Sequence, residues 1–262
     1  MLKYLAQLDR ILRGDATQLE SLEKGKIEIA VGGLSFILLL LAIIYGLCAG
    51  SYAIIQSHGQ NYMQLIASAV KLPLLFLLTL VVTFPSLYVF NALIGSRLSI
   101  ISSLRLLISS AGVMLAVLSS LGPIVVFFAL STSSYPFMVV LNVAMGTVSG
   151  LLGLGFLLRT LHRLVIIQEI PAIPPKQNPA PDTAANTTAQ QLSPLEQVGK
   201  STSRKAKRVF RIWTIVFALV GAQMSWVLRP LIGSPDMTFT WFREQQGNFF
   251  IAVFKALAAL FS

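Results

Sequence analysis

Long apolar stretches alternate with short polar segments along this chain. A helix needs about 20 consecutive apolar residues to cross a hydrocarbon core of about 30 Å. Stretches that meet this length occupy residues 30–55, 72–94, 106–130, 136–158 and 209–228. The pattern predicts an all-α fold, an integral membrane helical bundle with five transmembrane helices.

The composition supports a membrane location. Hydrophobic residues make up 55% of the 262-residue chain and charged residues only 11%, with a mean hydropathy of +0.76. Such a chain does not form a water-soluble globule. The net charge of +10 resides mainly in segments that flank the apolar stretches. Orientation in a bilayer explains this placement, so we expect no nucleic-acid partner.

Lys and Arg residues fall almost entirely on one side of the predicted membrane. Sixteen belong to the amino-terminal segment, the segment between spans two and three, and the segment leading into span five, whereas four belong to the other side. Positive residues favour the cytoplasmic face. The count predicts a cytoplasmic amino terminus and a carboxyl terminus across the membrane.

The segments outside the spans differ in character. Residues 1–29 carry apolar positions at helical spacing and predict cytoplasmic amphipathic helices, which either rest on the lipid interface or serve as a partner-docking arm. The predicted four-span membrane bundle covers 30–169. Residues 170–208 are rich in Pro and polar residues, then basic, and predict a disordered cytoplasmic tether before the fifth span, 209–228.

The carboxyl-terminal segment, 229–262, ends in an apolar run that is short for a span. A helix of about 14 residues reaches only about 21 Å. We therefore expect an extracytoplasmic or interfacial helix, with a sixth span as the alternative.

Several polar residues could form a transport path through spans two to four. No carboxylate lies inside any of the five spans, which disfavours a proton-coupled pump. Lys71, next to the predicted start of span two, either extends its ammonium group to the interface or acts inside the membrane. The candidate path consists of Lys71, Thr83, Asn91 and Asn142. The neutral members could instead join helices through hydrogen bonds.

Small and basic residues predict two further contacts. Gly146 and Gly150 have GxxxG spacing, and Gly153 extends the same small surface, so the fourth span should pack closely against another helix. Basic residues immediately before span five predict an orientation signal and contact with anionic lipid headgroups, or alternatively a regulatory or protein-docking surface. They include Arg204, Lys205, Lys207 and Arg208.

The sequence gives no signal for catalysis or for a cofactor. Cys48 is the single cysteine, and the predicted topology separates His58 from His162, so we expect no metal site. Motifs of familiar hydrolases and nucleotide-binding loops are missing. We expect a protein that is not an enzyme and binds no cofactor.

Residues 83–99 (TFPSLYVFNALIGSRLS), preceded by Lys71-Leu-Pro, resemble the Yip-like group of multi-pass membrane proteins. The similarity covers about residues 27–164. It implies a non-enzymatic membrane protein involved in organisation or trafficking. The tail, with WVLRPLIG at 226–233 and FREQQGNFF at 242–250, is similar to uncharacterised bacterial membrane proteins, so we expect a bacterial inner (plasma) membrane.

These observations favour a non-enzymatic scaffold that anchors partners in a membrane, with a channel or transporter as the alternative. The expected partners are membrane lipids, including anionic headgroups, and either other proteins or further copies of this chain.

Overall fold

A computed structural model gives the fold, and it describes residues 2–13, 31–57, 61–93, 100–169, 194–234, 237–244 and 247–261. Within these ranges the chain forms seven helices and no strand. In chain order they are α1 (Leu2–Leu12), α3 (Val31–Gln56), α4 (Tyr62–Leu93), α5 (Ile100–Ser131), α6 (Tyr135–Glu169), α7 (Pro194–Val227) and α8 (Phe249–Phe261). The expected all-helical fold is confirmed for the described part of the chain.

Four helices are long and apolar enough to cross a membrane. The qualifying segments are Gly32–Gln56, Tyr62–Ser86, Leu104–Ser131 and Tyr135–Thr160, which belong to α3, α4, α5 and α6. The apolar part of α7, Arg211–Val227, is shorter. The first four predicted spans therefore have counterparts among the long apolar helices.

The start of the second span was predicted wrongly. Helix α4 begins at Tyr62, ten residues before the expected boundary at residue 72. Residues 63–70 are largely apolar and contain no Gly or Pro, so nothing stops the helix from including Lys71. Lys71 consequently lies within the helix instead of next to it.

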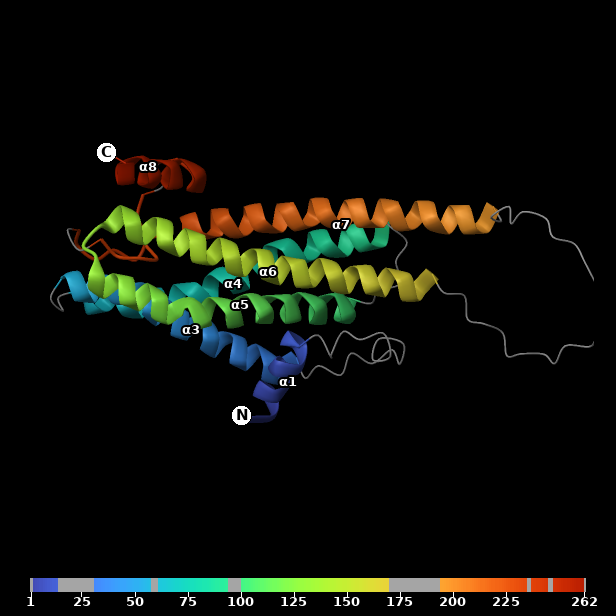
Figure 1. Ribbon diagram of the computed structural model, residues 1–262, viewed down its shortest axis with the longest axis horizontal. Helices are drawn as coiled ribbons and strands as arrows, with labels where there is room; N and C mark the ends of the chain where they lie inside the picture. The colour runs from blue at the N-terminus through green and yellow to red at the C-terminus, as the bar shows by residue number, and fades with distance from the viewer. Residues whose placement is uncertain are drawn as a thin grey trace, which may run out of the picture.

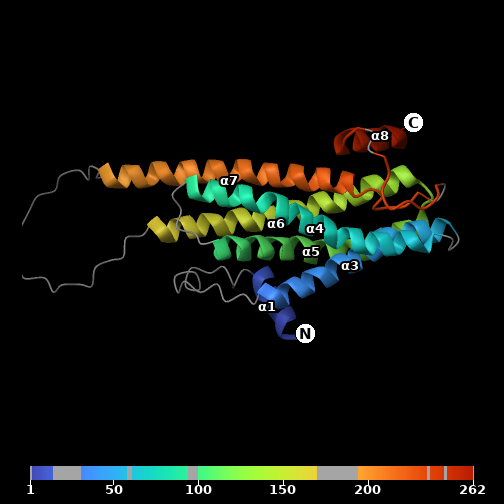
Figure 2. The same cartoon turned by 180° about the vertical axis from the view of Figure 1, so that it is seen from behind.

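The five long helices run side by side (Figures 1 and 2), and their contacts form a closed ring. Helix α3 packs against α4 on one side and α5 on the other, α5 packs against α6, and α7 contacts both α6 and α4. The fully buried Trp213 of α7 donates a hydrogen bond from its ring nitrogen to the Ser86 hydroxyl of α4, at 2.9 Å. Helix α7 is thus an integral part of the bundle.

Helices α3 and α4 lie close together at two glycines of α3. A Cβ atom on Gly46 would lie 2.6 Å from the Ser68 carbonyl oxygen, and one on Gly50 would lie 3.0 Å from the Leu65 Cα. This pair has the GxxxG spacing that allows two helix backbones to approach. This close helix contact was not predicted, because the GxxxG spacing in α6 was the one interpreted as a packing surface.

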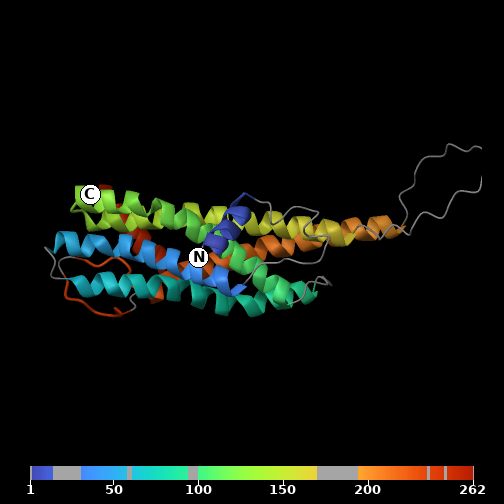
Figure 3. The ribbon, with the colours of Figure 1, turned by 90° about the horizontal axis from the view of Figure 1, so that it is seen from below.

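Helix α1 packs across the outside of α3 and α5 (Figure 3). Its residues Leu8 and Ile11 are buried, whereas Leu5 and Leu12 remain exposed. At least half of its apolar face is therefore covered by the bundle of the same chain. The second amphipathic helix that was expected before residue 30 lies outside the described residues.

Helix α7 begins earlier than expected. Residues 194–208, predicted to belong to the tether, form its first part. Pro194 is at the first helical position, where proline is favoured, and no further proline interrupts the helix. The rest of the predicted tether, 170–193, lies outside the described residues.

At its other end, α7 stops before the end of the bundle, and an irregular segment follows (Figures 1 and 2). The chain then forms α8, which packs against α6 and α7. With 13 residues, α8 has none of its side chains fully buried. Its length, about 20 Å at 1.5 Å per residue, is short for a span.

We predict that Gly46→Ala destabilises the protein. The added methyl group would meet backbone atoms of α4, which cannot move independently of the helix. Overpacking of this kind costs about 1–3 kcal/mol. Thermal unfolding in detergent should therefore show a lower midpoint for Gly46→Ala than for the wild type.

Gly32→Ala is the matched control, because a Cβ atom at this position of α3 meets nothing within 4 Å. Equal midpoints for the two variants would contradict the close packing of α3 and α4.

Candidate functional site: an apolar cavity with a basic end

Three buried polar residues of α4 lie on one face of the helix. Gln64, Ser68 and Lys71 recur at helical spacing, and all are nearly inaccessible to solvent. A polar face is unusual in a helix with the length and hydropathy of a membrane span. These side chains therefore need hydrogen-bond partners within the protein.

Their partners are carbonyl groups of the irregular segment 228–234. The Gln64 amide nitrogen and the Lys71 Nζ atom each donate to the Pro230 carbonyl, both at 3.1 Å. The Ser68 hydroxyl lies 2.6 Å from the Leu231 carbonyl oxygen. Irregular backbone at membrane depth is tolerated where protein groups satisfy it. The polar face of α4 performs this role.

Lys71 does not extend its ammonium group to the surface. Its side chain is only 1% exposed, and Nζ lies 5.3 Å from the centre of the Phe242 ring in addition to its bond to Pro230. A carbonyl oxygen and an aromatic face both stabilise a cation. The interpretation that Lys71 reaches the interface is therefore wrong, because the segment after α7 folds back over it.

The other candidate path residues lie in separate environments. The Thr83 hydroxyl donates to the Thr79 carbonyl of its own helix at 2.6 Å. Asn142 of α6 accepts a hydrogen bond from the Tyr45 hydroxyl of α3 at 2.9 Å. The side chain of Asn91 lies outside the described part of the chain.

The three glycines expected to pack α6 against another helix differ in their surroundings. A Cβ atom on Gly153 would lie 2.8 Å from the Met114 Cβ of α5, and the Gly153 carbonyl accepts a hydrogen bond from Ser110 at 2.9 Å. A Cβ atom on Gly150 would be in ordinary contact with Met114, at 3.6 Å, and one on Gly146 would meet nothing within 4 Å. Gly153 thus makes the close contact with α5.

Gly146 and Gly150 instead line a large cavity of about 1160 Å³. Its walls come from all five long helices, the segment after α7 and α8. Pockets that hold drug-sized molecules measure about 300–1,000 Å³. Leu151, one of the lining residues, is 67% exposed, so the cavity opens at the surface of the bundle.

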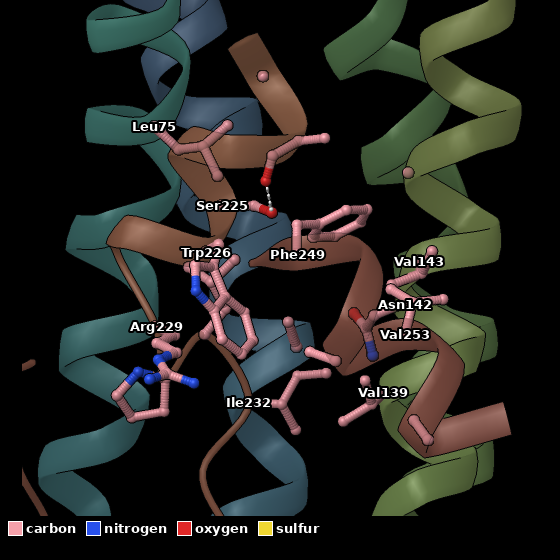
Figure 4. A pocket seen from close by; sticks show the side chains of 18 of the residues that line it. Leu75, Val139, Asn142, Val143, Ser225, Trp226, Arg229, Ile232, Phe249 and Val253 are labelled. Atoms are coloured by element: carbon pink, nitrogen blue, oxygen red, sulfur yellow. Dashed lines mark hydrogen bonds between the residues drawn. The ribbon is translucent and has the colours of Figure 1, made fainter. Parts of the chain in front are cut away.

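The cavity extends far along α6. Lining residues on this helix run from Tyr135 to Leu154, about 29 Å at 1.5 Å per residue. Trp226 and Arg229 lie across the cavity from Asn142 (Figure 4). The long walls are mainly aliphatic and aromatic, which suits an apolar ligand or an apolar chain.

One end of the cavity is basic. Arg229 and Arg243 both line it and both act electrostatically on Tyr135, the first residue of α6. The Arg229 guanidinium lies 3.8 Å from the centre of the Trp226 ring and donates to the Glu244 carbonyl. Its Nε atom is buried and has no hydrogen-bond partner.

The predicted headgroup-binding residues are far from this cavity in the sequence. Arg204, Lys205, Lys207 and Arg208 belong to the first part of α7, and their side chains lie outside the described part of the structure. Among the described residues, no group of three or more His, Cys, Asp or Glu residues could hold a metal ion.

Comparison with known protein families, with curated proteins and with solved structures finds no match to this chain. The resemblance to the Yip-like group therefore stays a prediction. The class of protein is inferred from the length and hydropathy of the helices alone. They define a helical protein with four membrane-spanning candidates.

We predict that Ser68→Ala destabilises the protein, because it leaves the partly buried Leu231 carbonyl without the donor that faces it. Leaving a buried polar group unpaired costs about 1–3 kcal/mol. The free energy of unfolding, measured in detergent, should fall accordingly.

Ser120→Ala provides the comparison, since Ser120 is exposed and its hydroxyl contacts only the Val117 carbonyl of its own helix. This variant should stay within about 0.5 kcal/mol of the wild type. An equally small effect of Ser68→Ala would contradict the role of the α4 polar face.

Proposed function

We propose that this chain is a non-enzymatic scaffold that spans the membrane five times, with a cytoplasmic amino terminus, and anchors partners. The observation that carries the proposal is the length of two helices. Helix α6 has 35 residues and α7 has 34, so they measure about 52 and 51 Å. A hydrocarbon core of about 30 Å holds little more than half of either helix.

One end of α6 and one end of α7 project from the same end of the bundle, beyond α3, α4 and α5 (Figures 1 and 3). The carboxyl-terminal part of α6 and the amino-terminal part of α7 form these projections. The projecting part of α7 includes the basic cluster 204–208. A rigid basic projection at the membrane surface provides a docking surface for an acidic partner.

The closed ring supports a fifth span. Helix α7 packs between α4 and α6, which are themselves long enough to cross a membrane. The hydrogen bond from Trp213 to Ser86 joins α7 to α4. The course of α7 alongside two candidate spans (Figure 2) supports the proposal that it crosses with them.

The hydrogen bonds of the candidate path residues favour a scaffold over a channel or transporter. Lys71 binds the segment after α7, Thr83 binds its own helix, and Asn142 binds α3. Each of these groups has a structural partner, as is common for polar residues that join helices in a membrane.

We predict the topology from the five-span proposal. In a Cys48→Ala background, a membrane-impermeant maleimide should label Ser133→Cys, in the turn before α6, and Ser262→Cys in intact cells. Ala6→Cys, on α1, should react only after permeabilisation. If Ser262→Cys instead reacts together with Ala6→Cys, the five-span topology is wrong, because either α7 does not cross or α8 crosses as a sixth span.

We also predict that the basic cluster recruits a protein partner. Substitution of Arg204, Lys205, Lys207 and Arg208 by Gln should reduce, severalfold, the recovery of a co-purifying protein from mild detergent, as quantified by mass spectrometry. Removing charges weakens an electrostatic contact, and the effect should shrink at high salt.

The control substitutes Lys3, Arg10, Lys24 and Lys26 by Gln, which removes the same number of positive charges from the same predicted side. Unchanged recovery with the cluster variant, or equal loss with both variants, would count against a docking role for α7.

A further inference from the structure

The lateral cavity combines an apolar body with a positively charged end. Its described lining residues that carry a formal charge are Arg229, Arg243, Lys255 and Glu244, three cations against one carboxylate. None of the three cations forms an ion pair with a described carboxylate within 4.0 Å. The cavity therefore has a net positive charge among its described residues.

The positive charges gather near one end of α6. Arg243 acts electrostatically on Lys71 as well as on Tyr135, and Arg229 also acts on Tyr135. Like charges at close range repel one another, and an anion between them would relieve this repulsion. The Nε atom of Arg229 is buried without a hydrogen-bond acceptor, and an anion oxygen that reached it would supply one.

The shape of the remaining cavity specifies the rest of the ligand. Beyond the basic end, α6 contributes Val139, Val143, Gly146 and Leu151, and α8 contributes Phe249. These residues form an apolar wall that continues along α6 and opens at the surface of the bundle. A molecule with an anionic head and a long apolar tail matches both parts of the site.

We infer that the cavity binds an anionic phospholipid of the surrounding bilayer. Its phosphate lies at Arg229 and Arg243, and one acyl chain lies along α6 past Gly146. Lipids reach the cavity directly, because it opens on the flank of helices that are apolar enough to cross the membrane. This inference does not depend on the scaffold proposal, which concerns the opposite end of the bundle.

The test is native mass spectrometry of the full chain, delipidated in mild detergent and titrated with phosphatidylglycerol or phosphatidylcholine. The wild type should retain phosphatidylglycerol at lower lipid concentrations than phosphatidylcholine. Replacing both Arg229 and Arg243 by Gln should weaken phosphatidylglycerol binding by about twenty-five-fold, a factor of about five for each basic group. Arg159→Gln, an exposed position of α6 outside the cavity, controls for lost charge.

A second pair of variants tests the apolar part without changing any charge. Gly146 and Gly155 are both on α6, and a Cβ atom on either would meet nothing within 4 Å, but only Gly146 lines the cavity. Gly146→Phe should therefore reduce lipid binding, whereas Gly155→Phe should bind as the wild type does. This pair decides the question even if the arginine variant fails to fold.

Three results would overturn the inference. They are equal retention of the two lipids by the wild type, unchanged phosphatidylglycerol binding by Gly146→Phe, and equal loss of binding in both glycine variants. A dimer that Gly146→Phe dissociates would also overturn it, because a second copy of the chain would then occupy the cavity.

Discussion

The backbone carbonyls of Pro230 and Leu231 must find hydrogen-bond donors, and much of this structure depends on how they do so. Helix α7 ends before the bundle does, so the chain continues as irregular backbone beside apolar helices. Without water, each unsatisfied carbonyl would be costly. Gln64, Ser68 and Lys71 of α4 supply the donors.

This solution fixes the position of everything that follows α7. Gly233 lies against α4 so closely that an added Cβ atom would collide with the Gln64 side chain. The segment held in this way brings Arg229 and Arg243 to the cavity and leads the chain back to α8 beside α6. The polar face of α4 is thus the support on which the basic end of the cavity is built.

The sequence predicted the fold better than the site because hydropathy is a local signal. Apolar length alone located α3 to α6, but it missed ten residues at the start of α4, six at the start of α5 and eleven at the end of α6. A charge such as Lys71 locally indicates the end of a span, and nothing near it in the sequence reveals its partner, Pro230, 159 residues later. The close packing at the glycine pair of α3 could be predicted from the sequence, because Gly46-Leu-Cys-Ala-Gly50 has the same GxxxG spacing as the glycines of α6.

The cavity could not be predicted from any single stretch. Its residues come from helices spread over most of the chain, and the two arginines of its basic end come from the segment after α7. Their role depends on the return of the segment after α7, which depends in turn on three side chains of α4. Contacts between residues so far apart in the chain produce no periodic pattern in the sequence.

The most direct measurement is the reactivity of Ser234→Cys compared with Thr238→Cys, each in a Cys48→Ala background, towards a water-soluble maleimide in proteoliposomes. Ser234 is buried at the end of the segment held by α4, whereas Thr238 is exposed four residues later. If the segment is packed against α4, Ser234→Cys reacts much more slowly than Thr238→Cys, and adding Ser68→Ala narrows the difference. Equal rates in the two single-cysteine proteins would contradict the account.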